Sequence, residues 1–346
     1  MDSSSTYSTQ LVFLLGTQRS GTTWLSNIFD SSPNTLLFME PFAPAYGIFP
    51  DFPEATFFLE QSSPAMDQLL REEMPRRLFR YKYLISERSL SNPAWFRVDR
   101  LLSNVVKRFG LFAPAWLLNR VRRFDALNLN RIDGSYPLFP KESPSTWVIK
   151  ELRFAGKIPI LMSAYPDARY VIIIRHPSAT VHSILTWFGR HRLVELRSAL
   201  DTYLEKVEVQ TAGAPYHPLI ERCRNAGIAH KVALYWRISY ETMYRQLKDS
   251  PLAKFVIYEQ LALQPQETTS SIFSWLDLPW SDSVDDYLMF SSSSLPERVT
   301  ALMTNRDSRR AYRAWLDSIT ASTSAAVEEV TGDSFLLPWF TPYYEG

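Results

Sequence analysis

The sequence predicts an α/β fold, in which a doubly wound parallel sheet of about five strands carries helices on both of its faces. Short apolar runs alternate along the chain with segments of helical periodicity, and a glycine-rich turn follows the first run. The chain has 346 residues, of which 46% are hydrophobic, so it can bury one large core or two modest ones. We predict a single domain over residues 1–346 with a helical insertion at 43–145.

The clearest strand lies at residues 170–174, because branched side chains dominate this run and favour extended backbone. Comparable apolar runs predict the remaining strands, at 11–15, 35–39, 147–150 and 254–258. Helices are expected after the strands, at 22–30, 155–164, 178–188 and 268–276. The first helix has an apolar stripe made of Trp24, Leu25, Ile28 and Phe29.

The segment between the second and third strands departs from this rhythm. Residues 71–131 contain 14 Lys or Arg against 5 Asp or Glu, whereas the whole chain has a formal charge of only +1. We expect a basic helical insertion that packs as a lid over the site, since basic helices are often solvated faces. The alternative is a surface for an anionic acceptor or an anionic lipid.

The composition argues against several classes of protein. With a formal charge of +1, the chain has no overall field that would draw it onto nucleic acid or a membrane. Its one cysteine, Cys223, cannot form a disulfide within the chain, and we expect it to be a buried small hydrophobe in a cytoplasmic protein. The run at 11–15 is too short for a signal peptide or a membrane span, so no integral membrane segment is expected. The sequence does not define an oligomeric state.

A loop that suits a phosphate group joins the first strand to the first helix, and it reads GTQRSGTTW over residues 16–24. Small residues let the backbone turn tightly around an anion, toward which the free N–H groups and the dipole of the helix point. Thr22 and Thr23 add hydroxyl donors, and Arg19 adds a fixed cation. The loop is P-loop-like, but it lacks the Gly-Lys-Ser/Thr ending of nucleoside triphosphatases. The alternative is an ordinary strand-to-helix turn.

A second cation follows the clearest strand. The run at 170–174 leads into Arg175, and Ser183 follows eight residues later on the next helix. An Arg and a hydroxyl at one strand end suit a phosphate, whereas a magnesium-dependent triphosphatase usually has Asp after such a strand. The sequence therefore predicts a ligand with two separate phosphate groups, such as 3′-phosphoadenosine 5′-phosphosulfate (PAPS).

These motifs resemble those of the PAPS-dependent sulfotransferase superfamily. Residues 19–24 (RSGTTW) resemble its 5′-phosphosulfate loop, and residues 170–185 resemble its 3′-phosphate motif with the same Arg-to-Ser spacing. Residues 255–261 (FVIYEQL) resemble a later strand end, although Gln260 replaces the usual acid. Residues 310–315 (RAYRAW) resemble the C-terminal Arg/Trp segment of the carbohydrate branch. The resemblance spans about 200 residues and leaves out the basic insertion.

The resemblance implies a PAPS-dependent sulfotransferase domain that needs no metal. Within the superfamily it leans to the carbohydrate, Golgi-type branch, because Arg19 stands where cytosolic enzymes usually have Lys, although Trp24 is like the cytosolic enzymes. The 5′ side of PAPS would be bound by Arg19, Ser20, Gly21, Thr22 and Thr23. Trp24 would stack on adenine and Tyr258 would lie near it. The 3′-phosphate would be held by Arg175, Ser183 and Arg306.

Sulfuryl transfer needs a base for the proton of the acceptor. The cytosolic branch has a His shortly after the third strand, but residues 147–153 contain none. Residues 38–41 (FMEP) resemble the carbohydrate branch instead, so the resemblance implies Glu40, at the end of the second strand, as the base. Strand ends of a parallel sheet face a common crevice, which places Glu40 beside the first loop. A carboxylate that caps a turn is the alternative role for Glu40.

Other charged groups complete the predicted catalytic set. Arg19 is expected to contact the bridging oxygen of the sulfate, and Lys150 to stabilise charge on the transferring sulfuryl oxygens. The alternative for Lys150 is a structural ion pair with an acid such as Glu151 or Glu40. His176 and His182 are second-choice bases, and no His/Cys cluster has the spacing of metal ligands.

The function predicted is sulfuryl transfer from PAPS to a hydroxyl or amine of a small-molecule or carbohydrate acceptor. A magnesium-dependent P-loop kinase is the alternative enzyme, and a non-catalytic binding module is a third possibility. The acceptor pocket is expected from residues 41–60 and the basic insertion, where aromatic side chains favour an apolar or planar acceptor and arginines favour an anionic one. Secondary metabolism is the expected setting.

Overall fold

The computed structural model describes residues 9–42, 64–75, 78, 144–189, 192–293 and 307–344. Its sheet has five parallel strands in the order β2-β3-β1-β4-β5. Their bounds are β1 Gln10–Leu15, β2 Thr35–Met39, β3 Thr146–Glu151, β4 Arg169–Ile174 and β5 Ala253–Ile257. The predicted α/β class and all five predicted strands are confirmed, with bounds that differ by at most one residue at either end.

The strand order places the expected site. β1 lies in the centre, with β3 on one side and β4 on the other, so the chain leaves β1 toward one edge of the sheet and returns to the other side with β4. In such a sheet ligands bind at the carboxyl ends of the strands, where the strand order reverses. That point lies at the ends of β1 and β4, where both predicted phosphate motifs begin.

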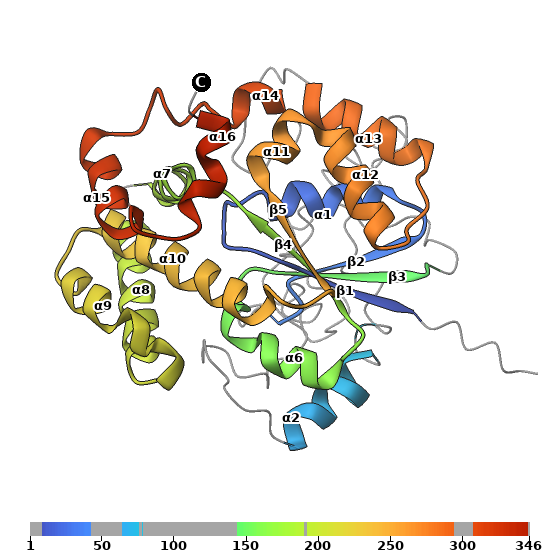
Figure 1. Cartoon of the computed structure of the whole chain (residues 1–346), viewed down its shortest axis with the longest axis horizontal. Helices are drawn as coiled ribbons and strands as arrows, with labels where there is room; N and C mark the ends of the chain where they lie inside the picture. The colour runs from blue at the N-terminus through green and yellow to red at the C-terminus, as the bar shows by residue number, and fades with distance from the viewer. Residues whose placement is uncertain are drawn as a thin grey trace, which may run out of the picture.

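Helices cover both faces of the sheet, as Figure 1 shows. On one face, an apolar core joins the strands to α1 Thr22–Ser31, α12 Pro265–Trp275 and α13 Asp282–Ser293. On the other face, a second core joins them to α6 Ile158–Ala164, which a 3₁₀ turn at Ala155–Lys157 precedes, and to α10 Ile228–Leu247. Strands buried on both faces need continuous apolar sequence, which explains why short apolar runs revealed them.

A helical lobe between β4 and β5 was not predicted beyond its first helix. α7 Pro177–Phe188 agrees with the prediction, and the chain continues through α8 Leu193–Glu208, a 3₁₀ turn at Thr211–Tyr216, α9 His217–Cys223 and α10. With α15 Ala321–Thr331 these helices form a core of their own, which contains Cys223 at 1% exposure. The prediction that Cys223 is a buried small hydrophobe is confirmed.

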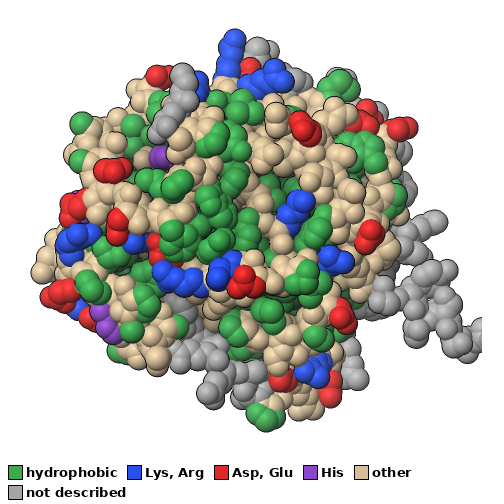
Figure 2. Space-filling view, viewed as in Figure 1, with side chains coloured by type: hydrophobic (Ala, Val, Ile, Leu, Met, Phe, Trp, Pro, Cys, Tyr) green, Lys and Arg blue, Asp and Glu red, His purple; other side chains and the backbone are tan. Residues whose placement is uncertain are grey.

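The C-terminal part of the chain returns to the carboxyl end of the sheet. Its elements are α11 Tyr258–Leu263, α14 Ser308–Ala311, a 3₁₀ turn at Leu337–Phe340 and α16 Thr341–Tyr344. Trp339 contacts the rings of Tyr244 and Phe255, which ties this segment to α10 and β5. Figure 2, viewed as in Figure 1, shows hydrophobic side chains gathered near the middle of the visible face.

Most of the predicted insertion at 43–145 lies outside the described residues, so its role as a lid stays a prediction. The described part contains α2 Pro64–Gln68 and a π-helical turn at Leu69–Glu73, and Leu70 and Met74 are buried in the core beside α6. None of the helices in the described ranges is long and apolar enough to cross a membrane.

Candidate active site

The loop after β1 has the tight geometry that its small residues predicted. Gly21 has φ 98°, and Arg19 has φ 66°, so both lie in the left-handed region, where any residue other than glycine is disfavoured. A Cβ on Gly16 would meet Thr22 Cγ2 at 2.8 Å and Ile173 O at 2.9 Å. The loop therefore closes on itself and against β4, and leaves no room for a side chain at Gly16.

Tyr240 of α10 anchors this loop, and sequence reasoning missed it. The backbone N–H of Thr17 donates to the Tyr240 hydroxyl over 3.1 Å, and that hydroxyl donates to Ile173 O over 3.0 Å. Trp236 stands one turn earlier on α10 and donates its Nε1–H to Arg175 O over 2.9 Å. The sequence did contain a signal for this contact: Trp236 and Tyr240 are four residues apart, so their large side chains are neighbours on one face of a helix. α10 thus fixes both predicted phosphate motifs.

We expect Gly21→Ala to destabilise the protein more than Gly189→Ala. Both residues have positive φ, which costs a residue with Cβ about 1–3 kcal/mol. A Cβ at Gly21 would also meet the Tyr258 ring at 2.4 Å, whereas Gly189 has open space around it. The free energy of unfolding in urea measures both losses, and an equal or smaller loss at Gly21 would contradict the close packing of Tyr258 on this loop.

The structure brings the two predicted phosphate motifs together. Arg19 Nε donates to the Ser183 hydroxyl over 3.0 Å, and Arg175 Nη1 donates to the backbone O of Arg19 over 3.1 Å. The guanidinium of Arg19 also lies over the Trp187 ring, 5.3 Å from its centroid. Two cations that follow β1 and β4, and a hydroxyl from α7, therefore meet at the carboxyl end of the sheet, which is an arrangement suited to anionic groups.

Arg175 retains the capacity to bind an anion. Its guanidinium lies over the Tyr258 ring at 4.6 Å, and its Nε is buried without a hydrogen-bond partner. A buried N–H of a cation without an acceptor is costly. A phosphate oxygen would supply that acceptor, so the residues present fit a phosphate-bearing ligand.

The other predicted donor-binding residues lie around the same edge. Thr22 and Ser20 are buried in the loop, where the Ser20 hydroxyl donates to Thr17 O over 2.8 Å. Trp24 is only 6% exposed because it packs in the core beside α1, and its buried Nε1–H donates to Ser291 of α13 over 2.9 Å. Its edge faces the Tyr258 ring at 6.1 Å. Contacts of Trp24, Tyr258 and Thr23 with PAPS stay predictions, and Arg306 lies outside the described residues.

His176 has a structural role behind the second motif. Its Nδ1 accepts the N–H of Ser178 and caps α7, and its ring stacks on Trp315 with centroids 5.2 Å apart. Burial, aided by the positive charge of Arg175, lowers the pKa of His176 to about 4. Burial likewise lowers the pKa of His182, whose Nε2 is 3.1 Å from the Ser318 hydroxyl. Trp315 belongs to the C-terminal Arg/Trp segment, which thus packs against the predicted 3′-phosphate motif.

A buried carboxyl group links this motif to the C-terminus. Glu259 accepts the backbone N–H of His176 over 3.1 Å and the hydroxyl of Tyr344 over 3.0 Å. It is fully buried, and burial raises its pKa, while Arg175 opposes that shift. The sequence marked this position as part of a family-like strand end, but the contact with Tyr344 depends on chain folding.

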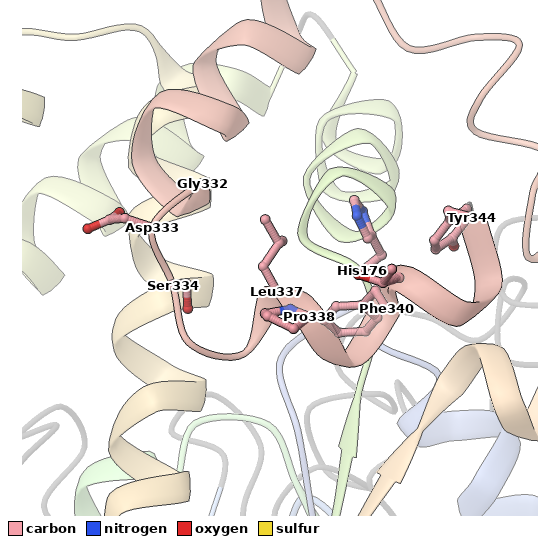
Figure 3. Close-up of a pocket in the computed structure, with 9 residues that line it drawn as sticks. His176, Gly332, Asp333, Ser334, Leu337, Pro338, Phe340 and Tyr344 are labelled. Carbon is pink, nitrogen blue, oxygen red and sulfur yellow. The ribbon is translucent and has the colours of Figure 1, made fainter.

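A surface hollow of about 360 Å³ lies next to His176 and Tyr344, as Figure 3 shows. The loop at 332–334 and the 3₁₀ turn at Leu337–Phe340 form its opposite side, and Asp333 points away from it, toward Arg237 of α10. None of Arg19, Arg175, Glu40 and Lys150 lines this hollow. It is therefore separate from the place where the phosphate motifs meet.

Glu40 and Lys150 form an ion pair at the ends of β2 and β3. Lys150 Nζ donates to Glu40 Oε1, with side-chain exposures of 2% for Lys150 and 15% for Glu40. The ion pair that the sequence offered as the alternative for Lys150 is thus present, and its partner is Glu40. Phe42 is 4% exposed and packs on the Phe154 ring at 5.0 Å, so it belongs to the core and not to the expected acceptor pocket.

Glu151, the last residue of β3, is a buried acid that sequence reasoning did not place in the site. Its Oε1 accepts the backbone N–H of Phe42 over 2.7 Å, and its exposure is 3%. Burial raises the pKa of Glu151 to about 8, and the negative charge of Glu40 adds to the shift. The hydrogen bond from the Phe42 N–H opposes the shift most, and the positive charges of Lys150 and Lys157 oppose it less. The Glu151 carboxyl is therefore largely neutral near pH 7.

The raised pKa of Glu151 predicts how stability depends on pH. Between about pH 4.5 and 8 the unfolded chain releases this proton while the folded chain keeps it. The contribution of Glu151 to the free energy of unfolding is therefore fully present below pH 4.5 and is lost as pH rises toward 8. The stability of Glu151→Gln relative to the parent should therefore increase with pH across this window, by at most about 1.4 kcal/mol per pH unit. Urea unfolding at several pH values measures the difference, and a flat difference would contradict the raised pKa.

Among the described residues, no group of three or more His, Cys, Asp or Glu side chains is arranged to hold a metal ion.

Comparison with known proteins agrees with this geometry. The sequence model of the sulfotransferase family matches residues 11–226, which include β1 to β4 and the helices up to α9. A protein-tyrosine sulfotransferase of Drosophila melanogaster is 25% identical over 126 residues. That match spans 36% of this chain and 19% of the relative, so the chain corresponds to a small part of the relative's length.

Solved sulfotransferase structures align along most of the chain at low identity. A sulfotransferase domain of the curacin biosynthetic pathway is 12% identical, with 93% of this chain and 97% of that chain covered and a TM-score of 0.40. A domain of the Synechococcus PCC 7002 olefin synthase is 14% identical, with coverage of 92% and 94% and a TM-score of 0.41. Since the family model covers more than half of the chain, this protein belongs to the sulfotransferase family.

Proposed function

We propose that this protein transfers a sulfuryl group from PAPS to a hydroxyl or amine of a small-molecule or sugar-like acceptor. One observation carries the proposal, which is that Arg19, Ser183 and Arg175 are joined by hydrogen bonds of 3.0 and 3.1 Å. PAPS carries a 5′-phosphosulfate and a 3′-phosphate on one ribose. A ligand of that shape suits two cationic motifs that lie next to each other but come from different strands.

In this proposal the loop after β1 binds the 5′-phosphosulfate and the motif after β4 binds the 3′-phosphate. Backbone N–H groups at the start of α1 and the guanidinium of Arg19 face the first anion. Arg175 binds the second anion with its unpartnered Nε–H, and Ser183 assists from α7. Trp24 and Tyr258 border the adenine, and their edge-to-face contact holds the two rings in place.

Glu40 serves as the general base, and the chemistry is a single in-line displacement. An acceptor oxygen or nitrogen forms a bond to sulfur, the bond from sulfur to the bridging phosphate oxygen breaks, and adenosine 3′,5′-bisphosphate leaves. Glu40 takes the proton of the acceptor. Lys150, which pairs with Glu40, holds that carboxylate in place and offers positive charge to the sulfuryl oxygens.

A planar acceptor suits the exposed surface beside this site. Trp187 is 37% exposed although the guanidinium of Arg19 lies over its ring, so part of an aromatic side chain is accessible beside a residue that the proposal assigns to the 5′-phosphosulfate. The name of the Drosophila relative gives a tyrosine phenol as the acceptor of that protein. We infer that phenols belong in the first set of acceptors to be tested, together with amines and sugar alcohols.

Calorimetric titration with adenosine 3′,5′-bisphosphate tests the donor site without knowledge of the acceptor. The comparison ligand is ATP with magnesium, which the alternative kinase would bind. We expect micromolar affinity for the bisphosphate and far weaker binding of ATP, because the end of β4 carries a cation and not an acid. Tight ATP binding without bisphosphate binding would overturn the sulfotransferase assignment and support the kinase.

A further inference from the structure

The turn that carries Glu40 has a backbone conformation that needs restraint. Glu40 has φ 47°, in the left-handed region, where a residue other than glycine is held only by its surroundings. Its N–H donates to Lys150 O over 2.8 Å, which continues the pairing of β2 with β3 by one step. Pro41 has no N–H. The next backbone donor is therefore Phe42 N–H, and it goes to the carboxyl of Glu151 over 2.7 Å.

The last two residues of β3 hold this turn from opposite faces of the sheet. Neighbouring side chains on a strand point to opposite faces. Lys150 pairs with the carboxylate of Glu40 on one face, and Glu151 accepts the N–H of Phe42 on the other. Phe42 is then buried against the ring of Phe154, so the turn cannot rotate without exposing an aromatic side chain.

We propose that Glu151 is a positioning residue that fixes the turn at residues 40–42 and thereby the direction of the Glu40 carboxylate. This inference rests on the proposed function, in which Glu40 is the base. Lys150 alone does not define that direction, because its ammonium is a compact point charge without the planar fork of an arginine, so the ion pair constrains distance more than orientation. The hydrogen bond from a backbone N–H to a buried acid constrains the backbone itself, two residues from the base.

The charge state of Glu151 suits this role. The ionisable groups that face it are Glu40 from β2, Lys150 beside it on β3 and Lys157 from the turn before α6. A neutral carboxyl accepts the N–H of Phe42 through its carbonyl oxygen and adds no negative charge next to Glu40. An ionised carboxyl would compete with Glu40 for Lys150 and favour the protonated form of the base. Glutamine at position 151 should therefore preserve the positioning role, because it keeps a neutral acceptor oxygen, whereas an apolar residue of similar size should abolish it.

Hydrogen exchange of the turn tests the proposal without an acceptor. Because Pro41 has no amide hydrogen, residues 40–42 contain two exchanging amide hydrogens, those of Glu40 and Phe42, and both are hydrogen bonded. In Glu151→Leu we expect fast exchange of the Phe42 amide, and in Glu151→Gln we expect the slow exchange of the parent protein. Should the leucine variant not fold, Glu151→Met, which has no acceptor oxygen, takes its place. Slow exchange of this amide in the apolar variant would overturn the proposal.

Turnover then separates a positioning role from a merely structural one. With labelled PAPS and tyramine, we expect Glu151→Leu to lower kcat by about 10- to 100-fold, with unchanged affinity for adenosine 3′,5′-bisphosphate and with recovery in Glu151→Gln. In a Glu40→Gln background the leucine change should cost nothing further, because the base is already absent. If Glu151→Leu lowered kcat as much in the Glu40→Gln background as in the parent, or did not lower it in the parent, Glu151 would not be a positioning residue for Glu40. Failure of the parent protein to bind the bisphosphate would instead count against the proposed function.

Discussion

Replacing Glu40 by Gln is expected to lower kcat for sulfuryl transfer to tyramine by about 10²- to 10⁴-fold, the usual contribution of a general base. The phenol of tyramine stays protonated near neutral pH, so its proton must be removed as the bond to sulfur forms. Gln has nearly the shape of Glu and can still accept a hydrogen bond from Lys150. The loss should therefore appear in kcat and leave the affinity for adenosine 3′,5′-bisphosphate unchanged.

The acidity of the acceptor supplies an internal control. 4-Nitrophenol is largely ionised in mildly alkaline buffer and needs no base, so Glu40→Gln should slow its sulfation much less than that of tyramine. Loss of the carboxylate also leaves Lys150, which is 2% exposed, without an ionic partner, so unfolding must be measured in parallel. An equal loss with both phenols would show that Glu40 acts in the fold or in binding, and not as a base.

The parts of the site that the sequence predicted are local in the chain. Gly16 to Thr23 form the loop after β1 and the start of α1. Arg175 directly follows β4, and Ser183 lies in the second turn of α7, so the chemistry of each motif is visible in a short stretch of sequence. The sheet was predictable for a similar reason, because a strand such as β4 is buried on both faces and reads as an unbroken apolar run. In both cases the structural constraint acts on neighbours in sequence.

The parts that the sequence did not predict depend on long-range contacts. Tyr240 reaches the loop after β1 across 223 residues, and Glu151 reaches Phe42 across 109. Nothing in the local sequence distinguishes Phe42 from an aromatic residue of an acceptor pocket. Its burial against Phe154 in the folded chain shows that it belongs to the core. The helices of residues 193–247 were not predicted, and their packing is long-range: apolar positions of α8 and α9 pack in a lobe beside the sheet, while Trp236 and Tyr240 of α10 pack on the sheet itself.

Arg175→Ala is expected to weaken the binding of adenosine 3′,5′-bisphosphate by about 100-fold, since a charged hydrogen bond to phosphate contributes about 2–3 kcal/mol. The affinity for adenosine 5′-monophosphate, which lacks the 3′-phosphate, is measured for comparison.

The variant should bind both nucleotides with similar affinity, whereas the parent protein should prefer the bisphosphate strongly. Arg222→Ala is the matched control, because it removes the same charge from a half-exposed arginine of α9. If Arg175→Ala weakened both nucleotides equally, Arg175 would act through its bond to the Arg19 backbone, as a support of the loop and not as a ligand of the 3′-phosphate. If Arg222→Ala gave the same loss, the general positive charge of the protein would explain the affinity. A selective loss of the preference for the bisphosphate is the result that only a direct contact between Arg175 and the second phosphate explains.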